Sequence, residues 1–247
     1  MRLKFSTLII CILLVSYLAN AQQYDSIIVA DGKKPDENNL IFLQGNVFTY
    51  QVETESDLDL PDQIIYTVLG LPTKKRTNRK QTEVVISTVP DKRKYENTGI
   101  VDNPSNLWMH PPRSGTLKVL ETCPFPYVKF PLEQGSSWSD QILIGEQWSL
   151  GMWKGKMLFD VVYSVVGKKQ LEMDNIRFEC WVIEATAQSE VGATKTTITY
   201  HEDEGFVELL FNTLQGDEIT FKLESIVQGP VYKNMNNYFT TKLNSSN

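Results

Sequence analysis

Hydrophobic and polar residues alternate along most of the chain from about residue 46 to residue 225. In the segment 47–53, for example, the apolar residues Phe48, Tyr50 and Val52 are separated by single polar residues. Successive side chains of a strand point to opposite faces of a sheet, so this spacing predicts a strand with one buried face.

Further strands are expected wherever the same pattern recurs with many Val, Ile, Tyr and Phe residues. In the first two thirds of the chain these segments are 63–69, 81–89, 117–120 and 158–166. The last third holds four more at 176–183, 193–201, 206–214 and 218–225, separated by short polar or Gly-containing turns. That spacing predicts an antiparallel meander.

Proline and tryptophan are concentrated between residues 103 and 155. Six prolines exclude a central strand or a helix interior from much of this segment, because proline lacks the backbone donor: Pro104, Pro111, Pro112, Pro124, Pro126 and Pro131. The segment is also too apolar for a solvated linker. We therefore expect an ordered, loop-rich segment that packs over the sheet.

The N-terminus is typical of a signal peptide. A short basic start precedes an apolar run over 5–18, and Ala19-Asn20-Ala21 has the small-x-small pattern of a cleavage site. The run is too short for a membrane anchor, and Cys11, preceded by Ile10, is misplaced for lipid attachment. We therefore expect a secreted or periplasmic protein, cleaved near Ala21. The remaining chain divides into a lead-in (22–45), one β domain (46–226) and a polar C-terminal tail (227–247).

Charge argues against nucleic acid as a partner. The formal net charge of the whole chain is −6, and cleavage after Ala21 would make the chain more acidic, whereas phosphate binding needs clustered Lys and Arg. Two basic clusters, 74–80 and 92–94, flank the strand expected at 81–89. Either could bind an anionic headgroup or polymer, but solvated turns explain them more simply.

Catalytic and metal-binding motifs are not found. The chain has two histidines: His201 lies in a polar turn and lacks the second His of a zinc motif, and His110 lies beside two prolines, typical of a rigid loop whose His and Arg bind carbonyl groups. There is no Gly-x-Ser-x-Gly turn. We expect no enzyme activity and no cofactor.

Two cysteines, Cys123 and Cys180, remain after cleavage. In an oxidising compartment they could form a disulfide that stabilises the fold by about 4 kcal/mol. Alternatively, Cys180 is a small core residue of its strand. The sequence leaves both open, since it does not show whether the two side chains come within bridging distance.

Three tryptophans, Trp138, Trp148 and Trp153, have three interpretations. They could belong to the core, line a sugar-binding groove, or close one mouth of a curved sheet that shelters an apolar ligand. Core packing is the simplest of the three.

The C-terminal pattern resembles a known family. It runs through Phe178-Glu179-Cys180-Trp181, a Thr-rich strand after Gly192, Tyr200-His201-Glu202 before Gly205-Phe206, and Ile219-Thr220-Phe221. Together with Gly135–Trp138 and Gly145–Trp148, these features are similar to the TapB-like exported bacterial proteins of the domain-of-unknown-function 3108 group, over roughly 107–225. The resemblance implies an all-β fold with a strongly curved antiparallel sheet, open-barrel or half-barrel in shape. It supplies no catalytic residue.

Such a sheet suggests three hypotheses. The first is an envelope protein that binds an apolar small molecule or lipid on the concave face, against residues that are equally a core set: Phe159, Tyr163, Phe178, Phe206 and Phe221, with the three tryptophans. The second is an interaction or scaffold module whose partner surface is the segment 103–155, favoured if Trp or Phe is exposed there. The third is a hydrolase, favoured only if His110 or His201 lies in a cleft beside a carboxylate and a hydroxyl.

Overall fold

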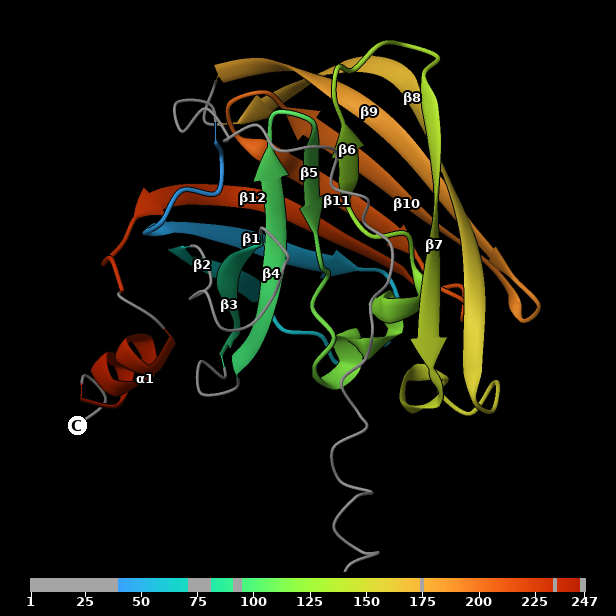
Figure 1. The fold of residues 1–247 in the computed structure, drawn as a ribbon, viewed down its shortest axis with the longest axis horizontal. Helices are drawn as coiled ribbons and strands as arrows, with labels where there is room; N and C mark the ends of the chain where they lie inside the picture. Colours follow the sequence, from blue (N-terminus) through green and yellow to red (C-terminus); the bar gives the residue numbers. More distant parts are fainter. Residues whose placement is uncertain (1–39, 71–80, 91–94, 174–175, 233–234, 245–247) are drawn as a thin grey trace, which may run out of the picture.

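The computed structural model is all-β: twelve antiparallel strands form one sheet, described here for residues 40–70, 81–90, 95–173, 176–232 and 235–244 (Figure 1). In chain order the strands are β1 (Asn46–Thr54), β2 (Gln63–Gly70), β3 (Thr82–Val89), β4 (Tyr95–Asn103), β5 (Asn106–Met109), β6 (Tyr127–Lys129), β7 (Ser137–Gly145), β8 (Lys156–Met173), β9 (Ile176–Ser189), β10 (Gly192–His201), β11 (Gly205–Asn212) and β12 (Glu218–Gln228). Across the sheet the order is β6-β5-β4-β3-β2-β1-β12-β11-β10-β9-β8-β7. Every strand therefore pairs with its neighbour in sequence, except that β1 pairs with β12 and β6 does not pair with β7.

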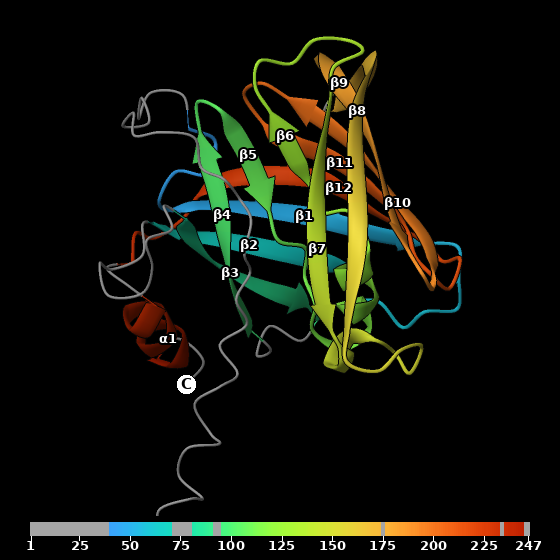
Figure 2. The ribbon, with the colours of Figure 1, turned by 45° about the vertical axis from the view of Figure 1, so that its right-hand side comes forward.

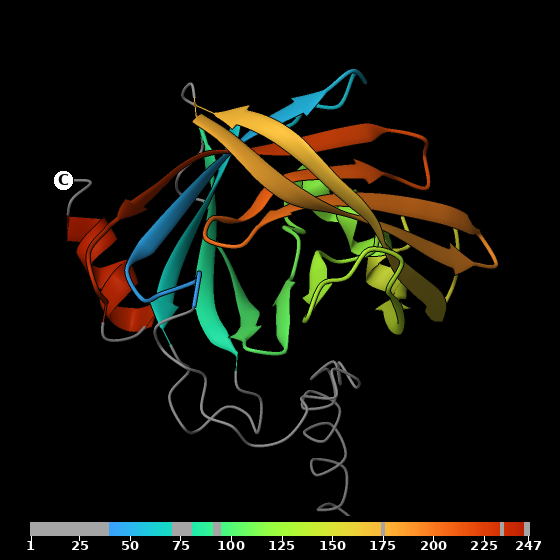
Figure 3. The ribbon, with the colours of Figure 1, turned by 90° about the horizontal axis from the view of Figure 1, so that it is seen from above.

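The sheet curls into a nearly closed barrel with one unsealed seam (Figures 2 and 3). Irregularities in register occur between β1 and β12, β2 and β3, β8 and β9, and β10 and β11. Such bulges bend a strand and increase its twist, which closes a sheet on itself. The seam lies between the two edge strands, β6 and β7, which Figures 1 and 2 place beside each other. The curved, barrel-like sheet is the fold class that we predicted.

Most of the predicted strands are confirmed. The alternation of apolar and polar residues determines which face of each strand is buried. In β1, Phe48 and Tyr50 are fully buried while Thr49 between them is partly exposed. The meander of the last third is confirmed as β9 to β12, with consecutive strands paired antiparallel. The predicted strand at 158–166 is the middle of β8, which is longer at both ends.

Two expectations for the middle of the chain are wrong. Residues Leu117–Leu120 do not form a strand but lie in the 3₁₀ helix η2 (Gly115–Thr122). Leu117 and Leu120 are buried and three residues apart, which is one turn of a 3₁₀ helix. The segment 103–155 is also less irregular than expected, because it contributes β5, β6 and β7 to the sheet, together with a second 3₁₀ helix, η3 (Glu146–Trp148).

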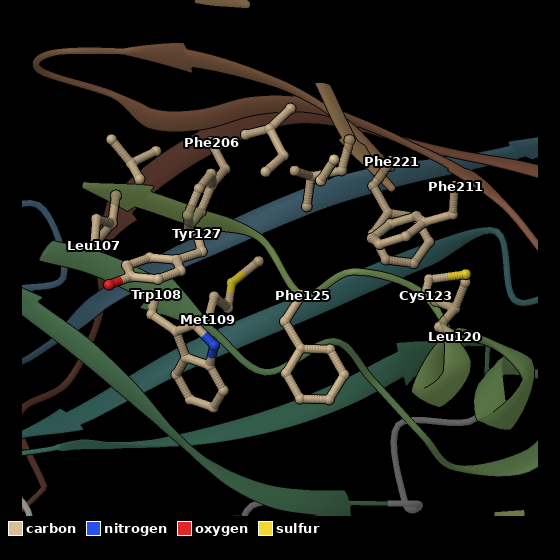
Figure 4. Close-up of a cluster of buried hydrophobic side chains, with 14 of the residues drawn as sticks. Leu107, Trp108, Met109, Leu120, Cys123, Phe125, Tyr127, Phe206, Phe211 and Phe221 are labelled. Atoms are coloured by element: carbon tan, nitrogen blue, oxygen red, sulfur yellow. The ribbon is translucent and has the colours of Figure 1, made fainter. Parts of the chain in front are cut away.

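Residues 122–126, which we call the plug segment, pack inside the barrel rather than over its outer surface. Cys123 and Phe125 are buried in the same core cluster as Phe211 and Phe221 of the opposite wall. Figure 4 shows Cys123 facing Phe211, and Phe125 beside Met109 and Trp108. The protein's own chain therefore fills the concave face.

Buried side chains satisfy the carbonyl groups of the plug segment. Thr194 Oγ1 donates to the Thr122 carbonyl and Thr196 Oγ1 to the Pro124 carbonyl, both at 2.7 Å. Tyr163 Oη donates to the Phe125 carbonyl at 3.0 Å. The Pro126 carbonyl accepts from the Met109 amide at 2.9 Å. Because a buried carbonyl without a partner is costly, these donors are what allow an irregular chain to cross the core.

The outer surface of β2 and β3 is covered by the C-terminal segment. The helix α1 (Met235–Asn244) lies outside the sheet (Figure 1), and Tyr232 and Tyr238 form a small second core with Leu69 and Val85. Among the described residues, no helix is both long and apolar enough to cross a membrane. The predicted signal peptide (1–21) and most of the lead-in lie outside the described residues.

We predict that removing the donors to the plug segment destabilises the fold. Thr194→Val and Thr196→Val each keep the shape of the side chain but leave a buried carbonyl without its donor, which should lower the free energy of unfolding by about 1–3 kcal/mol. Urea denaturation followed by tryptophan fluorescence measures the change. The matched control is Thr197→Val on the same strand, where the side chain is only partly buried. Equal effects at all three positions would contradict the proposed role of the plug contacts.

Candidate functional site

The side chains expected to face a ligand lie in the filled interior of the barrel. Phe159, Tyr163, Phe206 and Phe221 are almost completely buried, and Trp153 is buried with them. Phe178, Trp138 and Trp148 are partly buried and pack against the same cluster. The ring of Trp153 meets that of Phe159 edge-on, with centroids 5.9 Å apart. These residues form the barrel core. Core packing explains their burial, so their position does not test the prediction that they bind a ligand.

The seam is the place where the sheet is not closed by hydrogen bonds. Among the strands of the described residues, β6 pairs with β5 only and β7 with β8 only. Aromatic side chains bridge the two edges: the ring centroids of Tyr127 on β6 and Trp138 on β7 are 5.8 Å apart. Trp138 stacks on Tyr163 of β8, with centroids 5.3 Å apart and planes 7° apart. Tyr127 Oη donates to Asn106 Oδ1 at 2.8 Å.

Asp140 lies on the inward face of β7 beside this aromatic group. It is partly buried, and burial raises the pKa of its carboxyl group, opposed by a hydrogen bond from the Gln141 amide at 2.8 Å. Its charge in turn raises the pKa of Tyr163, which burial already raises strongly. No cationic side chain within the described ranges forms an ion pair with Asp140.

Outside the seam, exposed aliphatic residues occur on the outer surface of β7 and β8, between polar residues such as Gln141 and Asp160. Leu143 and Leu158 are cross-strand neighbours, and Val162 and Val166 follow on the same face of β8. Their exposed fractions are 44%, 44%, 53% and 43%. We call these four residues the outer stripe. Exposed aliphatic residues that share one face of a sheet are a candidate interaction surface.

A buried charged cluster surrounds His110, near the end of the barrel formed by η2. Its Nδ1 lies 2.7 Å from the Pro111 carbonyl, which confirms the predicted contact of this histidine with a carbonyl group. Its Nε2 lies 3.6 Å from Glu121 Oε2. Arg113 contacts carboxylates, with Nε 3.1 Å from Glu96 Oε1. Because His110 is buried, the arrangement is not the open cleft that the hydrolase hypothesis requires.

His201 lies at the turn between β10 and β11, as predicted. Its ring meets Phe178 edge-on, with centroids 5.1 Å apart, and its Nδ1 accepts from the Asp203 amide at 3.3 Å. No group of three or more potential metal ligands occurs in the described part of the chain.

Both cysteines are buried free thiols, so the structure contains no disulfide between them. Cys123 lies in the plug segment, and its Sγ is 3.7 Å from the Asn212 carbonyl oxygen. Cys180 lies on β9 opposite Lys169 of β8. Of the two alternatives left open by the sequence, the small core residue is the one present. The basic clusters at 74–80 and 92–94 lie outside the described residues.

Asp140 and Tyr127 are not among the site residues predicted from the sequence. The signal for Asp140 was present, because Trp138, Asp140, Ile142 and Ile144 alternate with Ser139, Gln141 and Leu143. That period of two predicts a strand, but the nearby prolines led us to expect loops. Tyr127 could not be found in this way, since its strand has three residues.

Comparisons with known proteins give structural likeness only. No family model and no curated protein matches the sequence. The hypothetical lipoprotein YmcC from Escherichia coli is 10% identical, with a TM-score of 0.37 over 76% of this chain and 89% of that one. A "putative lipoprotein" from Parabacteroides distasonis is 10% identical, with a TM-score of 0.45 over 76% and 99%. A "putative exported protein with YmcC-like fold" from Bacteroides fragilis is 14% identical, with a TM-score of 0.39 over 75% and 96%. None is described as TapB-like, so that resemblance stays a prediction.

We predict that His110 stays neutral throughout the physiological pH range. Burial, assisted by the charge of Arg113, lowers its pKa to about 3. Its NMR ring signals should therefore not shift between pH 5 and pH 8, whereas in the urea-unfolded chain they should titrate near the usual value of about 6.5. The unfolded chain then takes up a proton that the folded chain does not. The stabilisation from His110 is therefore present above about pH 6.5 and lost as the pH falls toward 3. A titration in the folded protein centred above pH 5 would contradict this.

Proposed function

We propose that this protein is a non-enzymatic, exported protein of the cell envelope that binds another protein through the outer surface of β7 and β8. The observation that carries the proposal is the contrast between the two faces of the sheet. The plug segment and the core side chains fill the concave face, whereas the outer stripe presents four aliphatic residues to solvent. The predicted signal peptide supports export.

The filled interior favours this proposal over the carrier hypothesis. A lipid on the concave face would have to displace Phe125 and Cys123, and Tyr163 would lose its hydrogen bond to the plug. The partner surface also differs from the predicted segment 103–155, because Leu158, Val162 and Val166 lie on β8, outside that segment. All of that segment is described, and its large exposed hydrophobic residues are Leu143 and Met152, neither of them Trp or Phe.

We expect a partner to be captured at the outer stripe. A photo-crosslinking amino acid at Val162 in the natural host should give one discrete protein adduct. The same amino acid at Lys195, an exposed position of β10, should give several-fold less of it. The double variant Leu143→Ser/Leu158→Ser should reduce the adduct at Val162, because it removes apolar contact area. Equal yields at both positions would contradict the proposed surface.

We also expect purified protein to contain no bound lipid. The exported chain, prepared without detergent and extracted with organic solvent, should yield no apolar molecule in stoichiometric amount by mass spectrometry. A stoichiometric lipid would contradict the proposed function and restore the carrier hypothesis, because it would show that the plug segment leaves or makes room for a ligand.

A further inference from the structure

The two edges of the sheet differ in how they are protected. β6 has three residues, ends in the exposed Lys129 and is flanked by Pro126 and Pro131. Short length, lysine and proline are the usual means of preventing a sheet edge from pairing with another chain. β7 has nine residues and contains neither lysine nor proline. It is therefore the edge that another strand could join.

The hydrogen-bond register shows which backbone groups of β7 face that edge. The Val165 amide donates to the Ser136 carbonyl at 2.9 Å, and the Val165 carbonyl accepts from the Gly135 amide at 2.8 Å, which places Ser136 at a position whose carbonyl binds β8. In an antiparallel ladder every second residue pairs in this way. The even-numbered residues of β7 therefore bind β8, and the amide and carbonyl groups of Ser139, Gln141 and Leu143 point toward the seam.

Side chains at this edge favour a basic partner. Asp140, on the inward face, accepts from the Gln141 amide, one of the groups that point toward the seam. The carboxylate of Asp140 thus occupies the position that a carbonyl group of an added strand would take. Beside it, the indole Nε1 of Trp138 is buried without a hydrogen-bond partner among the described residues. A carboxylate and an aromatic ring next to each other suit a lysine or arginine side chain.

We propose that the edge of β7 accepts an extended segment of a partner protein as an added strand, with a lysine or arginine of that segment placed against Asp140. The inference deepens the proposed function by naming the binding mode and the chemistry of the partner. Main-chain hydrogen bonds from Ser139, Gln141 and Leu143 hold the segment, and the charge pair sets its register.

Binding exchanges one set of contacts for another. A carbonyl of the added strand accepts from the Gln141 amide, which frees the Asp140 carboxylate to pair with the basic side chain. On the other face, the segment's outward side chains lie beside Leu143 and extend the outer stripe. A second copy of this protein fits the edge of β7 less well, because its folded sheet would meet Tyr127 and β6 across the seam. A single extended segment would meet only the side chains there.

The test uses peptides of nine residues, the length of β7, in which threonine and valine alternate around a central lysine. Binding is measured by tryptophan fluorescence and by NMR hydrogen exchange. The lysine peptide should slow exchange of the Ser139, Gln141 and Leu143 amides by about tenfold, because they become part of a ladder. It should bind about tenfold more tightly than the same peptide with a central glutamate. A peptide with proline next to the lysine should not bind.

Two variants separate the charge pair from general effects. Asp140→Asn should reduce the preference for lysine over glutamate to within about twofold. Glu190→Gln, which removes one charge in the turn after β9, should leave the preference unchanged. The proposal fails if the lysine and glutamate peptides bind equally, if no peptide protects the three amides, or if the protein dimerises through β7. A crosslink at Val162 without peptide binding would retain the proposed function and reject strand addition.

Discussion

The fold depends on hydrogen bonds between the plug segment and the barrel wall. An irregular chain inside a hydrophobic core must satisfy its carbonyl groups there, because water is excluded. Thr194 and Thr196 of β10 and Tyr163 of β8 supply those donors. Prolines at positions 124 and 126 ease the problem, since each removes one amide that would need an acceptor. The plug segment therefore forms one hydrophobic core with the strands β8 and β10 that hold it.

The internal plug bears directly on where the proposed partner could bind. A barrel of this kind offers a partner either its interior or its surface, and here Phe125 and Cys123 occupy the interior. Under the proposed function, the partner binds at the outer stripe and the neighbouring edge of β7. The two are continuous, because Leu143 belongs to both. The proposed function is thus a form of the second hypothesis at a different surface, since the exposed Trp or Phe that would favour the segment 103–155 is not found there.

Local pattern predicted much of the fold and little of the site. Strands with regular alternation, such as β1 and β9 to β12, could be found because one of their faces is buried. The segment of η2 was predicted as a strand because Leu117 and Val119 alternate with Lys118, whereas the burial of Leu117 and Leu120, three residues apart, fits a 3₁₀ helix. The entry of residues 122–126 into the barrel depends on Thr194 and Thr196, 72 positions away in each case. No local pattern carries that information, and the same is true of the approach of Tyr127 to Trp138.

Accessibility of Cys123 tests most directly whether the plug segment fills the barrel. In the exported Cys180→Ser variant, with the predicted signal peptide removed, Cys123 is the remaining thiol. It is completely buried in the core. Its reaction with a thiol reagent should therefore proceed no faster than global unfolding, and added fatty acid or detergent below its micellar concentration should not change the rate. Rapid reaction in the folded protein, slowed by the apolar additive, would show an open interior that binds ligands and would contradict the account.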